Sequence, residues 1–354
     1  MLTRQDILGW LRESDPARLG ELWRRADETR RRCVGDDVHL RGLVEASNHC
    51  VRQCAYCGIR AGRRDLERYR MTADEILACA RQATALGYGT LVLQAGEDPG
   101  LTADFVVGVV AGIKRETPLA VTLSLGERDE SELALWREAG ADRYLLRFET
   151  ANRELFDRIH PPRGDRPCDR LAQLRRLRGL GYEVGSGVMT GIPGQTWDDL
   201  ADDIALFAEL DLDMIGVGPY LPHPETPLGA GGLRDDDPAQ VPNDELTTLK
   251  AVALARLVCP FANIPSTTAL ATINRDSGRE HGLERGANVV MPNLTPISYR
   301  VCYEIYPGKA CLYEEPAACA GCLRLRIESI GRRVGVGPGH ARSHRAARAG
   351  ARKE

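Results

Sequence analysis

The sequence predicts an α/β protein whose core is a complete (β/α)8 barrel of the TIM type, with an N-terminal helical cap and a C-terminal extension. The chain has 354 residues, and a barrel of this kind takes about 250, which leaves room for both additions. Eight short apolar runs alternate with helical patterns along the sequence, as a parallel sheet joined by helices requires. A doubly wound open sheet would give the same alternation, so the number of strands is what favours the barrel.

The barrel is expected over residues 41–300, where strands and helices alternate. The strand-like runs cover residues 43–46, 90–94, 119–124, 143–147, 183–188, 214–217, 260–264 and 288–291. The helical stretches between them cover residues 73–86, 104–114, 130–139, 170–180, 196–210, 244–257 and 279–285. Barrel enzymes carry their chemistry at the carboxyl ends of the strands, so functional residues are expected there.

Three segments flank the predicted barrel. Residues 1–40 contain apolar positions at helical spacing, among them Ile7, Trp10 and Leu22, and we expect a helical cap. Residues 301–331 form a C-terminal segment that carries further cysteines. Residues 332–354 hold seven Lys or Arg residues and one Glu, and this composition is typical of a disordered, solvated tail. The string GVGPGH in this tail lacks the preceding strand and following helix that a phosphate-binding loop needs.

Composition and charge exclude several classes of protein. The chain is 43% hydrophobic with a formal net charge of −3, which is unlike a disordered chain and argues against nucleic acid as the main partner. No apolar run approaches the roughly 18 residues needed to cross a bilayer. The first twelve residues are polar and contain no signal-peptide core. We therefore expect a protein without a membrane segment or secretion signal.

The eleven cysteines are the unusual feature of the composition. Six form two tight trios, and their spacing is considered below. The other five stand alone, and lone cysteines are usually small buried hydrophobes. We expect packing roles for these five, with Cys302 less clear because it adjoins the second trio. They are Cys33, Cys79, Cys168, Cys259 and Cys302.

The first trio, Cys50, Cys54 and Cys57, has the spacing C-x3-C-x2-C and follows the first expected strand. Three thiols cannot all pair as disulfides. A structural zinc site needs four ligands, and His49 is poorly placed to be the fourth because it adjoins Cys50. A 4Fe–4S cluster normally takes four thiolates, and three would leave one iron open to a small molecule. The spacing therefore favours an open-site cluster over zinc.

With Tyr56 before its last cysteine, this string resembles the signature of the radical S-adenosylmethionine (SAM) superfamily. The resemblance implies that the open iron binds the amino and carboxylate groups of SAM. It also implies that the reduced cluster cleaves SAM to a 5′-deoxyadenosyl radical. The expected cofactors are thus a 4Fe–4S cluster and SAM, while the substrate is left open by this motif.

Charged and polar residues stand at several other strand ends. In LQAGED, residues 93–98, a glycine lets the backbone approach a ligand and Glu97 is placed to accept from a ligand ammonium. The superfamily carries a Gly-Gly-Glu-like motif at the corresponding position, and Ala95 replaces its first glycine here. After the fourth expected strand, Arg147 and Glu149 are either ligand contacts or a structural ion pair. Arg170 opens the next helical stretch, where it could face a carboxylate.

The last third of the chain offers two further candidates. Thr267 and Thr268 follow the seventh expected strand and either bind an anion or cap the next helix. Met291 ends the eighth strand and is expected to point into the barrel mouth. The second trio follows with the spacing C-x7-C-x2-C, which is moderately specific for a second iron–sulfur cluster, with Cys302 or water as a conceivable fourth ligand. It comprises Cys311, Cys319 and Cys322.

Taken together, the motifs resemble the HydE type of FeFe-hydrogenase H-cluster maturase. The resemblance runs in order from about Val44 to Gly331 and is carried by SNHCVRQCAYCGIR, LQAGED, TLSLGER, LLRFETAN, GIPGQT, GVGPYLPHPETPL, IPSTTA, ANVVMPNLTP and YPGKAC with its two later cysteines. It implies SAM and the catalytic cluster at the top of a large internal cavity. In this family the substrate is thought to be an organometallic iron–cysteine synthon bearing carbon monoxide and cyanide. The second trio matches an accessory cluster site that only some members carry and that is regarded as dispensable.

The resemblance also assigns roles residue by residue. The cluster ligands would be Cys50, Cys54 and Cys57. The SAM-contacting positions would be Tyr56, Gln94, Glu97, Ser124, Glu149 and Arg170. The residues lining the cavity and its anion or substrate sites would be Thr122, Arg147, Thr267, Thr268, Met291, Tyr303 and Tyr306.

The resemblance extends to partners and setting. We expect an electron donor such as ferredoxin or flavodoxin, other hydrogenase maturases of the HydG and HydF types, no nucleic acid and no membrane. An oxygen-sensitive cluster that needs a reductant points to the cytoplasm of an organism with an anaerobic metabolism.

Three other functions compete with the maturase. A methylornithine-synthase-like mutase is disfavoured by the second trio and the YPGK segment. A biotin-synthase-like sulfur inserter needs auxiliary ligands on barrel strands, and Cys168 and Cys259 are not at inward strand ends in the predicted arrangement. A non-catalytic iron–sulfur carrier has no use for Glu97, Glu149 and Arg170.

Overall fold

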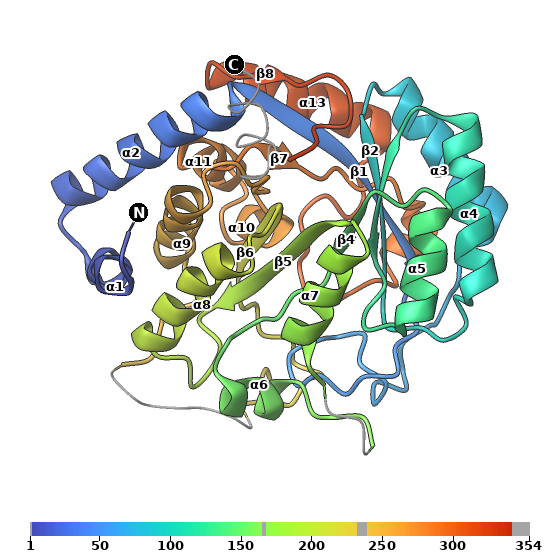
Figure 1. The fold of residues 1–354 in the computed structure, drawn as a ribbon, viewed down its shortest axis with the longest axis horizontal. Coiled ribbons are helices and arrows are strands. Elements are labelled where there is room, and N and C mark those ends of the chain that lie inside the picture. Colours follow the sequence, from blue (N-terminus) through green and yellow to red (C-terminus); the bar gives the residue numbers. More distant parts are fainter. Residues whose placement is uncertain (1, 165–167, 232–238, 342–354) are drawn as a thin grey trace.

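The fold is a curled parallel sheet surrounded by helices (Figure 1). The computed structural model describes residues 2–164, 168–231 and 239–341. Within them the strands run in the order β6-β5-β4-β3-β2-β1-β7, and β8 pairs with β1. The strands are β1 (Asp37–Ser47), β2 (Thr90–Ala95), β3 (Ala120–Ser124), β4 (Arg143–Leu145), β5 (Glu183–Thr190), β6 (Met214–Pro219), β7 (Val289–Val290) and β8 (Arg333–Val334).

Helices follow most strands and pack on the outer face of the sheet (Figure 1). Many begin at a residue whose side chain caps the first turn, as Thr72 does with Glu75 and Thr196 does with Asp199. The helices are α1 (Arg4–Arg12), α2 (Pro16–Val34), α3 (Ala73–Ala85), α4 (Ala103–Glu116), α5 (Glu130–Glu138), α6 (Arg153–Ile159), α7 (Arg170–Gly179), α8 (Trp197–Glu209), α9 (Glu245–Val258), α10 (Thr268–Ile273), α11 (Gly278–Glu284), α12 (Ile297–Arg300) and α13 (Pro316–Ser329).

Residues 263–266 lie between the two ends of the sheet, where the seventh strand was predicted. Asn263 forms a parallel bridge with Met214 of β6, and Pro265 forms one with Val289 of β7. The Ser266 amide also donates to the Val289 carbonyl at 2.9 Å. The segment is irregular because a proline has no N–H to donate to a ladder. The curled parallel sheet agrees with the predicted barrel class, and a complete eight-stranded barrel stays a prediction.

Glycines on β5 and β6 allow close packing inside the curled sheet. A Cβ on Gly187 would lie 2.0 Å from the Gly216 carbonyl oxygen, so these two strands approach too closely for any side chain there. A Cβ on Gly218 would lie 3.2 Å from Thr267 Oγ1. Strand β6 therefore has no side chain at Gly216 and Gly218, two positions that line the candidate site.

The first two helices pack on the outer helical layer. Helices α1 and α2 lie beside α8 and α9 (Figure 1), and Trp10 and Leu11 are buried in that contact. Lys250 of α9 donates to the Leu11 carbonyl oxygen at 2.9 Å. Strand β1 already begins at Asp37, inside the range 1–40 expected for a cap, and the proposed domain boundaries stay a prediction.

The segment after Arg332 differs from the disordered tail that its charge suggested. Residues up to 341 are ordered against the amino ends of the strands, beginning with β8. The Pro338 carbonyl oxygen accepts from Arg143 Nη2 at 2.9 Å and from Thr90 Oγ1 at 3.0 Å. The Gly339 carbonyl oxygen accepts from Arg41 Nη2 at 3.1 Å. Buried guanidinium groups need acceptors, and these carbonyls provide them. The rest of the predicted tail, residues 342–354, lies outside the described residues.

Membrane spans are not found in the described part of the chain. None of its helices combines the length and the apolar composition that crossing a bilayer requires.

Candidate active site

One cavity at the carboxyl ends of the strands gathers most of the residues predicted to be functional. Its wall is formed by the loop after β1, by the ends of β2, β3, β6 and β7, and by the segment after α12. The predicted residues that line it are Cys50, Cys54, Tyr56, Cys57, Gln94, Glu97, Ser124, Arg147, Glu149, Arg170, Thr267, Thr268, Met291, Tyr303 and Tyr306. The sequence motifs, although spread over most of the chain, thus meet in one place.

The loop that carries the first cysteine trio is tied to its surroundings by backbone hydrogen bonds. The Val51 amide donates to the Glu97 carbonyl oxygen at 2.9 Å, and the Ala55 amide donates to the Ile159 carbonyl oxygen at 2.7 Å. All three thiols are free and line the cavity. Burial, and then the nearby Cys50, raise the pKa of the Cys57 thiol to about 12. Three such thiols become thiolates only beside a cationic centre, which fits an iron–sulfur cluster.

Gly96 is required by the packing of this same loop. A Cβ at this position would lie 2.2 Å from the His49 carbonyl oxygen and 2.8 Å from Cys50 Cβ. We expected this glycine to let the backbone approach a ligand. In the structure it lets the end of β2 approach the cysteine loop, which sets where the thiols lie.

Glu97 already has protein partners for both carboxylate oxygens. Arg52 Nε donates to Oε1 at 2.7 Å, and the Glu127 amide donates to Oε2 at 2.9 Å. Arg52 lies between Cys50 and Cys54 in the sequence, so this ion pair joins the cysteine loop to β2. The predicted bond from a ligand ammonium to Glu97 stays a prediction.

Arg147 and Glu149 form the ion pair that the sequence left as one of two alternatives. Arg147 Nη2 lies 3.0 Å from Glu149 Oε2, and both side chains also line the cavity. Glu149 has a φ of 63°, in the left-handed region that residues other than glycine rarely adopt. Strain of this kind is commonly found at functional sites. The Tyr56 hydroxyl donates to Glu149 Oε1 at a long 3.5 Å.

Arg170, at the start of α7, is partly buried and faces the carboxylate of Glu127. Its Nε lies 3.1 Å from Glu127 Oε1. Burial acts to lower the pKa of Arg170, but the neighbouring Tyr56 and Glu127 outweigh it and raise the pKa above its usual value. Glu127, in the loop between β3 and α5, was missed as a site residue because the TLSLGER string that contains it was used only as a family motif.

A second buried ion pair at the cavity wall was also missed. Lys309 contacts the carboxylate of Glu45 on β1, and Asn293 Nδ2 donates to the other Glu45 oxygen at 2.9 Å. The Lys309 ammonium lies 5.3 Å from the ring centre of Tyr303. The Tyr303 hydroxyl accepts from Gln94 Nε2 at 3.2 Å. The YPGK string was the available signal, but it was used only as a family motif.

Thr267 and Thr268 form the N-terminus of helix α10. Thr267 Oγ1 accepts from the Leu270 amide at 3.3 Å and so caps α10, the second of the two alternatives weighed for it. Thr268 is the first residue of the helix, and its carbonyl oxygen accepts from Thr272. Both residues line the cavity, as does Tyr306, whose pKa is raised by burial.

Four predicted residues are not among those that line the cavity. Thr122 lies within β3, buried, and its hydroxyl has no hydrogen-bond partner among the described residues. The second trio lies in the C-terminal segment, with Cys319 and Cys322 on α13. Arg279 Nη2 donates to Cys311 Sγ at 3.4 Å, and Cys322 is exposed. The second trio is therefore not part of the cavity wall.

Comparison with known proteins agrees with this site. The family model of the Radical SAM superfamily matches residues 44–207. The FeFe hydrogenase maturase subunit HydE of Thermotoga maritima is 48% identical over 314 residues, which cover 89% of this chain and 86% of the relative. The chain belongs to the HydE family. It is a radical SAM enzyme related to hydrogenase maturases, as the motifs predicted, and membership implies a 4Fe–4S cluster and SAM.

More distant relatives of this HydE-family chain catalyse other reactions. The 3-methylornithine synthase of Methanosarcina barkeri is 30% identical over 299 residues, covering 84% of this chain and 81% of the relative. The crystal structure of methylornithine synthase (PylB) superposes with a TM-score of 0.78 at 26% identity, covering 95% and 94% of the two chains. The fold is therefore shared with methylornithine synthase, so the fold alone does not set the substrate.

Proposed function

We propose that this HydE-family enzyme generates a 5′-deoxyadenosyl radical and acts in assembly of the diiron subcluster of the FeFe-hydrogenase H-cluster. The proposed substrate is an iron–cysteine synthon that carries carbon monoxide and cyanide. The observation that supports this most is the meeting of three free thiols with Glu149 and Arg170 on one cavity. We further propose that residues 263–266 close the sheet into a complete barrel around it.

The residues at the cavity mouth would hold the cofactors. Cys50, Cys54 and Cys57 would bind the 4Fe–4S cluster, leaving one iron for the amino and carboxylate groups of SAM. When bound, this pair supplies the 5′-deoxyadenosyl radical. The remaining residues bind and orient SAM; they are Tyr56, Gln94, Glu97, Ser124, Glu149 and Arg170.

The rest of the cavity would receive the substrate. A primary carbon radical reacts with almost any C–H bond, so the enzyme has to exclude water and fix the target atom. Gly216 and Gly218 line the cavity without side chains, and Arg147 supplies positive charge for an anionic substrate. The residues proposed for this part are Arg147, Thr122, Thr267, Thr268, Met291, Tyr303 and Tyr306, with Thr122 in a deeper position.

The finer assignments of partners and of a second cluster are also proposals. We propose that Cys311, Cys319 and Cys322 can hold an accessory iron–sulfur cluster that turnover does not need. Electrons would come from a ferredoxin or flavodoxin, and the product would pass among maturases of the HydG and HydF types. An oxygen-sensitive cluster favours a cytoplasmic setting in an anaerobic metabolism.

The experiment that tests the substrate offers three compounds to the reconstituted, reduced enzyme. These are the cyano-carbonyl iron–cysteine synthon, lysine and dethiobiotin, and the readout is consumption of SAM with conversion of each compound. We expect turnover with the synthon alone. Turnover with lysine would replace the proposal by the mutase, which the shared fold supports. Turnover with dethiobiotin would replace it by sulfur insertion.

A further inference from the structure

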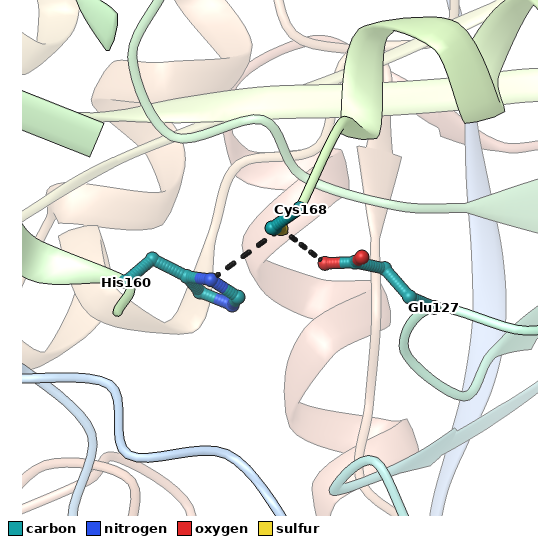
Figure 2. A group of neighbouring side chains, drawn as sticks. All are labelled: Glu127, His160 and Cys168. Carbon is teal, nitrogen blue, oxygen red and sulfur yellow. Dashed lines mark hydrogen bonds between the residues drawn. The ribbon is translucent and has the colours of Figure 1, made fainter. Parts of the chain in front are cut away.

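Four side chains form a closed ring of hydrogen bonds behind the cavity wall. Glu127 comes from the loop after β3, His160 ends α6, and Cys168 and Arg170 lie at the start of α7. Figure 2 shows the first three pointing toward one another across the gap between these segments. Of the four, Arg170 is the one that lines the cavity. The ring therefore touches the site through a single guanidinium group.

The ring is closed by contacts between adjacent members. Cys168 Sγ lies 2.6 Å from Glu127 Oε1 and 3.6 Å from His160 Nδ1 (Figure 2). Arg170 Nε lies 3.1 Å from Glu127 Oε1, and Arg170 Nη2 contacts His160 Nε2. His160 is fully buried and Cys168 nearly so. Because the members come from three segments, the ring fixes those segments relative to one another.

The chemistry of the four side chains determines which group donates in each hydrogen bond of the ring. A guanidinium only donates, so His160 Nε2 accepts from Arg170 and the imidazole proton lies on Nδ1, facing Cys168 Sγ. Burial, together with Arg170 and Arg52, lowers the pKa of His160 to about 2, so the imidazole is neutral. Burial and then Glu127 raise the pKa of Cys168 to about 12, so the thiol keeps the proton that it donates to Glu127.

The spacing of Glu127, His160 and Cys168 resembles that of a metal site, since their ligand atoms lie within 4.8 Å of one another. The surrounding charges argue for a different role. Arg52 Nη2 lies 2.9 Å from Glu127 Oε2, and Arg170 occupies the other Glu127 oxygen and the His160 nitrogen. A divalent ion would lie against two fixed guanidinium groups. The guanidinium groups of Arg52 and Arg170 therefore take the place that a metal cation would have beside these three side chains.

The same bonds define which N–H groups of Arg170 remain for a ligand. Nη1 donates to the Arg147 carbonyl oxygen at 2.6 Å, in addition to the Nε and Nη2 bonds. A guanidinium has five N–H groups, and the bonds among described residues leave one on each terminal nitrogen. Two N–H groups, one on each terminal nitrogen, can bind a carboxylate through two parallel hydrogen bonds. The guanidinium also lies 5.7 Å from the ring centre of Phe156, which restricts its tilt.

We propose that Glu127, His160 and Cys168 are positioning residues that fix the Arg170 guanidinium so that its two remaining N–H groups bind the SAM carboxylate. The inference rests on the proposed SAM site. It assigns a function to Cys168, which the sequence suggested was a packing residue. It also explains why a histidine, a thiol and a carboxylate are gathered where none of them reaches the cavity.

The test compares SAM binding in single variants of the cluster-loaded full chain. Cys168→Ala opens the ring, and Cys168→Ser restores a group that accepts from His160 and donates to Glu127. Cys259→Ala, another buried cysteine far from the ring in sequence, controls for the loss of a buried thiol. The dissociation constants of SAM and of decarboxylated SAM are measured by anaerobic equilibrium dialysis. Iron content and the rate of 5′-deoxyadenosine formation at saturating SAM are measured beside them.

We expect Cys168→Ala to weaken SAM binding about tenfold, the size of losing support for a charged hydrogen bond. Decarboxylated SAM should bind as it does to the parent, because it lacks the group that Arg170 holds. The rate at saturating SAM should stay near that of the parent. Cys168→Ser should recover most of the affinity, and Cys259→Ala should bind SAM normally.

Two results would overturn the inference. One is unchanged SAM affinity in a folded, iron-replete Cys168→Ala. The other is an equal loss for SAM and its decarboxylated analogue, which would indicate a general structural defect. If Cys168→Ala does not fold, Cys168→Val, which fills the volume but can neither donate nor accept, opens the same ring and faces the same two outcomes. A parent enzyme that binds no SAM at all would instead refute the proposed function.

Discussion

Arg52 Nη2 lies 2.9 Å from Glu127 Oε2, and this ion pair joins the cysteine loop to the loop after β3. Arg52 also pairs with Glu97 at 2.7 Å, so one guanidinium connects three segments that wall the cavity. Its side chain is only 9% exposed, which places the charges where water screens them little. The position of the thiols therefore depends on a buried ionic contact as well as on the backbone.

Arg52→Ala is predicted to destabilise the fold and to lower cluster incorporation. Removing one partner of a buried ion pair leaves carboxylates without compensation and costs about 3 kcal/mol. The free energy of unfolding from urea titration and the iron content after reconstitution check this. Arg24→Ala removes a pair on the exposed face of α2 and should leave both quantities unchanged, since exposed pairs contribute little. Full iron content in Arg52→Ala would contradict the role given to this residue.

Cys319→Ala is predicted to lower iron content while most of the activity remains. The second trio lies on α13 and the segment before it and is not among the residues that line the cavity, so a cluster there would not contact the substrate. Iron analysis and the rate of 5′-deoxyadenosine formation separate the two effects. Abolished turnover in a folded variant would show that the accessory site takes part.

Deletion of the chain after Gly331 is predicted to destabilise the fold by about 3 kcal/mol. The Arg41 and Arg143 side chains would lose their acceptors at Gly339 and Pro338. Deletion after Ala341 keeps every one of these bonds and is the matched control. Thermal unfolding of both shortened chains checks the difference, and equal melting temperatures would refute this account of the segment.

His160 is predicted to make the fold sensitive to acid. Burial lowers its pKa to about 2 from a usual value of 6.5, so below pH 6.5 the unfolded chain takes up a proton that the folded chain does not. Stability therefore falls as the pH drops through that window, by about 1.4 kcal/mol for each pH unit from this one group. Urea unfolding of cluster-free protein at pH 6 and pH 5 should show that the free energy of unfolding falls less in His160→Gln than in the parent. Equal slopes would mean that His160 titrates normally in the folded chain.

The sequence predicted the parts of the site that are local motifs. The spacing of Cys50, Cys54 and Cys57 specifies a ligand set within one loop, and parallel strands bring the motifs at their carboxyl ends to one edge. The ring of Glu127, His160 and Cys168 was not predicted, because its members come from separate loops and no spacing connects them. Three-dimensional packing creates that relationship.

The segment of residues 333–341 was not predicted to be ordered, for a related reason. Its composition of Arg, Gly and Ala is typical of disorder, but its order comes from carbonyl groups that every sequence has. Their partners, Arg41 and Arg143, lie about 200 or more residues earlier on β1 and β4, and pairing across that distance follows from topology alone. The irregular segment at Pro265 is likewise a consequence of one missing N–H within the sheet.

The central claim is that the first cysteine trio supports radical chemistry with SAM in this cavity. The most direct measurement is the anaerobic formation of 5′-deoxyadenosine from SAM by the reconstituted, reduced enzyme, compared with Cys57→Ala. The account predicts reductive cleavage by the parent and none above background by the variant, in which one thiol ligand is missing. Cleavage by Cys57→Ala at the rate of the parent would contradict it.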